Sequence, residues 1–259
     1  MTTGALLAAL DLPPAAIVDR RVPKTLLVEH GAPTPADARH VNERIDALTW
    51  VAALKPATSG NAEYHNDVRE YLEIAVLHLA LRKTDGPAEG TGSRLVELVH
   101  RAVPYPVILL ADDGDAGVVG LSAAHKRWSQ GKGGAVVLDG DVLSIAWDRS
   151  DPELASAGRE ALGLSRQPRI SMLAAYQGWM DTIVALRAAR LTGAFTPVPS
   201  STPASERLTA LRECEEVDQE IARLRSAAAK EKQMARKVEM NLTLKRLEAR
   251  RASAMERLS

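Results

Sequence analysis

The chain has 259 residues, of which 46% are hydrophobic and 3% aromatic, and its 33 basic and 33 acidic side chains give a net charge of zero. That length accommodates one good-sized domain with an appendage or two small domains, and the neutral charge argues against nucleic-acid binding over the whole surface. The single cysteine, Cys214, excludes an intrachain disulfide framework and a multi-cysteine zinc site, and it is typical of a cytoplasmic protein. No apolar run is long enough to span a bilayer, so we expect no membrane partner.

The first part of the chain predicts helices and strands in an α+β arrangement. Thr34 and Pro35 form a typical helix start, and Asp139-Gly140 between two apolar runs predicts a hairpin. Because several strands are joined as hairpins and the later helices are segregated from them, we expect a mainly antiparallel sheet with flanking helices. The strands are expected at 48–54, 71–81, 107–111, 118–124, 135–138 and 142–147. The helices are expected at 3–10, 35–45, 93–102, 153–164 and 170–191.

The last part of the chain predicts a helix that needs a partner. From residue 206 onward there is no glycine, proline or aromatic residue, and strong helix formers dominate. Apolar residues recur there at steps of four and three, which is the spacing of a coiled-coil seam. Asn241 falls on or beside this seam, where a polar residue sets register and partner number. The seam residues are Val217, Ile221, Leu224, Ala228, Val238, Asn241 and Leu242.

These elements predict four segments along the chain. They are an α+β domain over 1–150, a helical segment over 151–193, a linker rich in proline, serine and threonine over 194–205, and a long coiled-coil helix over 206–259. The seam favours assembly with a protein partner or with a second copy of the chain, although packing against the chain's own helices is the alternative.

The end of this helix is also basic. From Ser226 to Ser259 there are nine lysine or arginine residues against four acidic ones. Such an excess is usual for a solvated helix face, but it also allows contact with nucleic acid. The candidate contacts are Lys237, Lys245, Arg246, Arg250 and Arg251.

No group of residues in the sequence identifies a reaction. The glycine-rich segment 129–134 carries a lysine, but it lacks the frame of a phosphate-binding loop and precedes a strand rather than a helix. A metal-dependent nuclease would need clustered carboxylates, for which Glu73 with Asp112 or Asp113 is the best candidate. The histidines are scattered, and His78 is most simply a hydrogen-bonded core histidine. We therefore assign no catalytic, cofactor-binding or metal-binding residue.

Several short blocks along the chain resemble the bacterial and archaeal domain-of-unknown-function family 4391. The blocks are Val22 to Leu26, Leu48 to Trp50, Leu54 to Pro56, Tyr71 to Ile74, Val103 to Val107, Lys230 to Gln233 and Arg236 to Asn241. The resemblance brings no catalytic residues. It implies a context, because such proteins are often encoded beside helicases and DNA methyltransferases in restriction-like or anti-phage loci.

The leading hypothesis is a non-enzymatic accessory or adaptor subunit of a DNA-processing complex, assembled through the C-terminal helix. A helicase and a DNA methyltransferase are its expected partners. Two alternatives remain open: a metal-dependent nuclease, and a DNA-binding subunit that uses the basic end of the helix.

Overall fold

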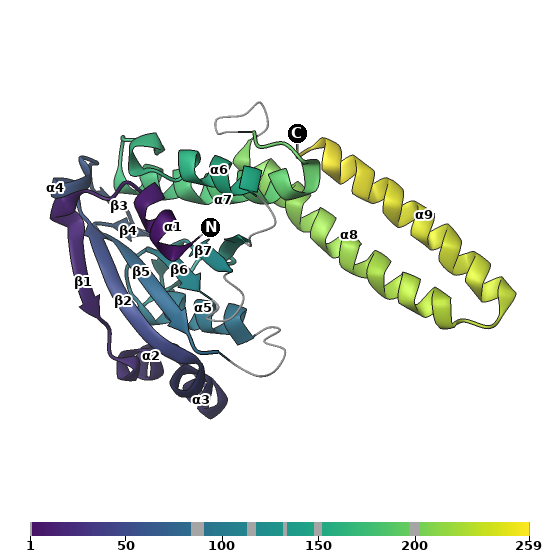
Figure 1. The fold of residues 1–259 in the computed structure, drawn as a ribbon, viewed down its shortest axis with the longest axis horizontal. Helices are drawn as coiled ribbons and strands as arrows, with labels where there is room; N and C mark the ends of the chain where they lie inside the picture. The colour runs from purple at the N-terminus through teal and green to yellow at the C-terminus, as the bar shows by residue number, and fades with distance from the viewer. Residues whose placement is uncertain are drawn as a thin grey trace. The chain divides into compact units, whose positions relative to one another are not determined.

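A computed structural model describes residues 2–83, 91–112, 118–131, 134–147, 152–196 and 203–258 (Figure 1). The chain forms two compact units, Met1–Ile183 and Val184–Ser259. The strands are β1 (Ile17–Arg21), β2 (Ile45–Leu54), β3 (Tyr64–His65), β4 (Glu70–Tyr71), β5 (Ile74–Leu81), β6 (Val107–Asp112), β7 (Val119–Ala123), β8 (Lys126–Trp128), β9 (Val136–Leu138) and β10 (Leu143–Trp147). The helices are α1 (Thr3–Ala9), α2 (Lys24–Gly31), α3 (Pro35–Arg44), α4 (Pro56–Ser59), α5 (Thr91–Ala102), α6 (Pro152–Ala161), α7 (Met172–Thr192), α8 (Ala204–Lys230) and α9 (Met234–Glu256), with short 3₁₀ turns at Pro14–Ala16 and Leu164–Arg166.

The first unit is built on a mixed sheet of six strands in the order β1-β2-β5-β6-β7-β10. β5 and β6 are parallel, while the other neighbours are antiparallel. The fold is therefore α+β as expected, but the expectation of a mainly antiparallel sheet is replaced by a mixed one. The reason is α5, which lies between β5 and β6 in the chain. This helix carries the chain back to the end of the sheet where β5 begins, so that β6 can run parallel to β5.

The hairpin predicted around Asp139-Gly140 is wrong. The strand before it, β9, pairs with β8 in a separate two-stranded sheet, and the strand after it, β10, pairs with β7 at the edge of the main sheet. Gly140 has a φ of 90°, so the dipeptide does form a turn, but that turn passes between two sheets. The glycine-rich segment 129–134 joins β8 to β9, with residues 132–133 outside the described part of the chain.

One face of the sheet carries an apolar core. Three helices, α2, α3 and α5, cover this face and bury residues of β2, β5 and β6 (Figure 1). Thr34 caps α3 as expected, because its hydroxyl accepts a hydrogen bond from the amide of Asp37 at 3.1 Å. Tyr176 of α7 is fully buried, and its hydroxyl lies 2.8 Å from the carbonyl of Val107, which joins α7 to β6.

The second unit corrects the expectation of one long helix over 206–259. α8 ends at Lys230 and α9 begins at Met234, and Figure 1 shows the two running side by side in opposite directions. Glu231 and Gln233 have extended backbones with ψ of 129° and 118°, and the Glu231 carboxylate accepts a hydrogen bond from the Gln233 amide at 2.7 Å. The turn lets the apolar faces of both halves bury one another within one chain.

Two further expectations fall on residues that the structure leaves undescribed. Asp113 lies outside the described ranges, as do residues 197–202 of the predicted linker. None of the described helices is long and apolar enough to cross a membrane.

Candidate functional site

The hairpin of α8 and α9 has a small apolar core of its own. Val217 and Ile221 pack with Leu247, and Leu224 and Leu244 lie half-buried against them. Ala228 of the predicted seam is also buried. The α8 half of the seam therefore faces another helix, and that helix is α9 of the same chain.

The remaining seam residues do not face α8. Val238 and Leu242 are 51% and 54% exposed, and Asn241 is also exposed. The buried face of α9 instead carries the residues Leu247, Ala254 and Leu258, which are 8%, 0% and 2% exposed. They are spaced by seven and four residues, which fits a helix seam in a different phase from the predicted one.

The hairpin turn thus leaves an apolar stripe on α9, formed by Met234, Val238 and Leu242. These residues are four positions apart, so they lie above one another on one helix face. Met234 is 75% exposed, which makes the stripe most open at the start of the helix. We call these three residues the α9 stripe.

The basic residues of α9 divide into two groups. Arg250 and Arg251 form ion pairs with Glu213 and Asp218 of α8, each at 2.6 Å. Arg250 and then Arg257 hold the pKa of the Glu213 carboxyl below its usual range. The two arginines therefore join the helices of the hairpin, which is a role that sequence reasoning did not consider.

The other cations of α9 are exposed, namely the predicted contacts Lys237, Lys245 and Arg246 together with Arg236. Within the described residues they have no ion pair. Lys245 and Arg246 follow Leu242 by three and four positions, so they extend the face of the α9 stripe. This face combines exposed apolar groups with unneutralised positive charge.

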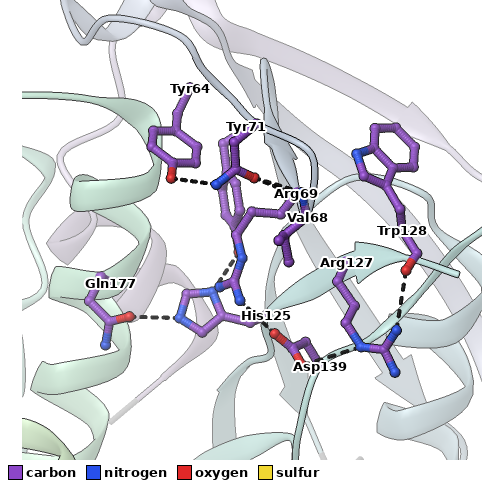
Figure 2. Close-up of polar contacts among 10 residues, drawn as sticks. Tyr64, Val68, Arg69, Tyr71, His125, Arg127, Trp128, Asp139 and Gln177 are labelled. Atoms are coloured by element: carbon purple, nitrogen blue, oxygen red, sulfur yellow. Dashed lines mark hydrogen bonds and ion pairs between the residues drawn. The ribbon is translucent and has the colours of Figure 1, made fainter. Parts of the chain in front are cut away.

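The first unit holds a polar network beside the small sheets (Figure 2). The hydroxyl of Tyr71 lies 2.5 Å from Nδ1 of His125, and Nε2 of His125 lies 2.7 Å from Oε1 of Gln177. Burial raises the pKa of Tyr71 and lowers that of His125, which favours a neutral phenol that donates to a neutral imidazole. Both groups have hydrogen-bonding partners, so the network connects β4 to α7 and has a structural role.

Arg69 and Arg127 share the carboxylate of Asp139 at 2.6 and 3.4 Å, next to this network in Figure 2. All three side chains are between a fifth and two fifths exposed. The cluster connects the segment after β3 to the β8–β9 sheet. Because both guanidinium groups already share the Asp139 carboxylate, the cluster offers only a weak site for an anion.

A cavity of about 240 Å³ lies beside β8 and is lined by Glu73, Tyr105, Lys126 and Trp128, among others. Burial lowers the pKa of Lys126 to about 7, and its ammonium donates to the carbonyl of Val103. One carboxylate oxygen of Glu73 lies 3.2 Å from Lys55, while the other is buried without a hydrogen-bond partner among the described residues. The cavity is lined by acidic and basic side chains. Its described lining includes no nucleophile that is hydrogen-bonded to a general base, so it does not identify a reaction.

The carboxylates proposed for a nuclease lie far apart. Asp112 pairs with Ala80 near the end of β5, whereas Glu73 precedes Ile74 at the start of the same strand. At about 3.3 Å per residue the two are separated by about 20 Å, too far to share a metal ion. No cluster of three or more metal-ligating side chains occurs among the residues that the structure describes.

Asp112 has a different partner. Its Oδ2 lies 2.7 Å from Nε2 of His78, and the hydroxyl of Thr3 lies 3.4 Å from the same oxygen. His78 is 22% exposed, so it is a partly exposed histidine that is hydrogen-bonded to Asp112, rather than the core histidine that the sequence suggested.

Comparison with known proteins gives one match. The family described as a domain of unknown function (DUF4391) matches residues 10–250. No curated protein and no solved structure matches the chain.

Proposed function

Because the chain belongs to the DUF4391 family, whose function is unknown, we propose from its surfaces that it is a non-enzymatic accessory or adaptor subunit that assembles through α9. The α9 stripe carries this proposal, since Met234, Val238 and Leu242 are exposed whereas the other large apolar residues of α8 and α9 are buried or half-buried. Exposed apolar side chains gathered on one face are typical of a surface that binds a partner.

The proposed setting is a DNA-processing complex of a restriction-like or anti-phage kind. This part of the proposal rests on the family resemblance, because relatives are often encoded beside helicases and DNA methyltransferases. Such enzymes carry out the chemistry themselves, so an adaptor needs a docking surface and no catalytic group.

Co-purification from the native host tests this proposal. We expect a tagged chain to retain a helicase or DNA methyltransferase, and the double variant Val238→Glu/Leu242→Glu to lose it. Ile170→Glu is the matched control, because Ile170 is 84% exposed in the first unit. Circular dichroism verifies that the helices remain. If the double variant retains the same proteins and the same molar mass in light scattering, the α9 stripe is not the docking surface.

Direct contact with nucleic acid is a second candidate, favoured by Lys237, Lys245 and Arg246, which are exposed and have no ion pair within the described residues. Binding of a labelled DNA duplex should weaken with salt. Neutralising these three residues to glutamine should reduce the slope of log affinity against log salt by about one for each phosphate that is no longer neutralised. Arg250→Gln and Arg251→Gln should leave the slope unchanged, because both residues are paired with carboxylates. DNA binding whose slope falls in the control variants instead would contradict this assignment.

A further inference from the structure

A second apolar opening lies in the first unit, where β1, β2 and α2 face the end of α5 and the segment after it. The cavity has a volume of about 330 Å³, which is within the range of natural binding pockets. Its apolar lining includes Val22, Leu26, Leu27, Trp50, Leu77 and Tyr105. Figure 1 shows α2 beside the end of β1 and the start of β2.

This cavity extends from the surface to the apolar core formed by β2, β5 and β6 with α2, α3 and α5. Leu27 and Leu77 are 1% and 2% exposed and belong to the apolar cluster between the sheet and its helices. Leu26 and Tyr105 are 44% and 42% exposed and also line the cavity. An apolar side chain from another molecule that entered here would replace water against the protein core, which is favourable.

The charged residues that line the cavity are two arginines. Arg20, Arg21 and His30 are part of its lining, and no carboxylate is among the described residues that line it. Arg20 pairs with Trp50 across β1 and β2, so the two side chains lie on the same face of the sheet. Lys24, at the start of α2, is not part of the lining; burial and then the positive charge of Arg82 lower its pKa, while the carboxylate of Asp46 raises it.

The backbone of β1 does not favour pairing with an added strand. β1 is an edge strand, but its register shifts between Ile17 and Arg20, and Asp19 has a φ of 46°. A break of this kind disrupts the row of backbone groups that a strand would need. Recognition at this edge therefore depends on side chains that enter the cavity.

We propose that this cavity binds an acidic peptide segment of a protein partner, which inserts an apolar side chain against Leu27 and Leu77 and places carboxylates beside Arg20 and Arg21. Two arginines, Arg20 and Arg21, fit a segment with more than one carboxylate better than a small amphiphile with one. The cavity lies in the first unit and is a second contact beyond the proposed docking surface on α9.

Selection from a random peptide library displayed on phage tests the proposal with the full chain. We expect the enriched peptides to combine aspartate or glutamate with leucine, phenylalanine or another large apolar residue. A synthesised and labelled peptide from that set should bind Leu26→Asp and Arg20→Glu/Arg21→Glu at least about tenfold more weakly by fluorescence anisotropy. Arg20 and Arg21 are exposed, so their reversal to glutamate should not disturb folding. This double variant therefore keeps the test valid if Leu26→Asp does not fold.

Three controls separate this site from other surfaces. Arg39→Glu reverses an exposed charge elsewhere in the first unit and should leave binding unchanged. Val238→Glu/Leu242→Glu should also leave it unchanged, because the α9 stripe is a different surface. Binding of decanoate tests whether the cavity takes a small amphiphile with one carboxylate instead of a peptide. The proposal fails if no acidic and apolar peptides are enriched, if they bind the cavity variants as well as the wild type, or if decanoate binds here and peptides do not.

Discussion

Lys126 is a buried cation with a consequence for stability. It is 4% exposed, and burial lowers its pKa to about 7 from 10.5. Between these values the unfolded chain holds a proton that the folded chain has released, so the free energy of unfolding rises with pH by up to about 1.4 kcal/mol per pH unit. Lys126→Met should remove this rise between pH 7 and 9.5, measured by urea unfolding at several pH values. Identical pH profiles for the two proteins would show that the ammonium is solvated in the fold.

His100 creates the corresponding effect in acid. It is fully buried, with Nε2 at 3.0 Å from the hydroxyl of Ser122, and burial followed by the charge of Lys126 lowers its pKa to about 3 from 6.5. Below pH 6.5 the unfolded chain gains a proton that the folded chain does not, so stability falls as the pH drops toward 3. The free energy of unfolding of His100→Met should fall less steeply between pH 6.5 and 4.5 in the same unfolding assay. The exposed His65 is the control, since His65→Gln should retain the wild-type slope.

At the scale of elements, Gly31 sets how closely α2 approaches α5. A Cβ atom at this position would lie 2.6 Å from the carbonyl oxygen of Leu98 and 2.9 Å from Cβ of Ala102. Gly31→Ala therefore forces the two helices apart and should cost about 1–3 kcal/mol of stability in chemical unfolding. Gly4→Ala in α1 is the matched control, because no described atom lies within 4 Å of its Cβ position and alanine favours a helix. A Gly31→Ala protein as stable as the control would mean that α2 can shift at no cost.

Local signals in the sequence located most elements but not their partners. Thr34 and Pro35 predicted the start of α3 because a helix cap is a contact between near neighbours in the chain. Asp139-Gly140 also formed its turn, yet the choice between β7 and β8 as strand partners depends on residues far away in the sequence. The turn at Glu231–Gln233 has neither glycine nor proline, so only the packing of Leu247 on Val217 and Ile221 indicates it.

At the scale of the whole molecule, the parallel pair β5–β6 was predictable and the α9 stripe was not. The sequence already showed a strand, a helix and a strand in succession at 71–81, 93–102 and 107–111. That succession is the connection that parallel strands require, although the hairpin signals elsewhere in the sequence favour antiparallel pairing. Exposure of Val238 and Leu242 follows from the reversal of the chain into a hairpin, which no local spacing determines.

The division into Met1–Ile183 and Val184–Ser259 predicts that a core substitution in one unit destabilises that unit and not the other. Leu109 is 1% exposed under α5, and Leu247 is 8% exposed between α8 and α9. Truncating either to alanine leaves a cavity and should cost about 2–5 kcal/mol locally. Hydrogen exchange followed by mass spectrometry should then show faster exchange over β5 and β6 in Leu109→Ala, and over α8 and α9 in Leu247→Ala.

Val238→Ala is the control for the second unit, because its side chain is exposed and its removal should leave exchange within α8 unchanged. Each effect should stop at the unit that carries the substitution, since apolar side chains stabilise only the residues with which they pack. Equal acceleration across all described segments in both variants would mean that the chain unfolds as one cooperative body. The hairpin would then be part of the core fold, and α9 could not act as a separately foldable docking element.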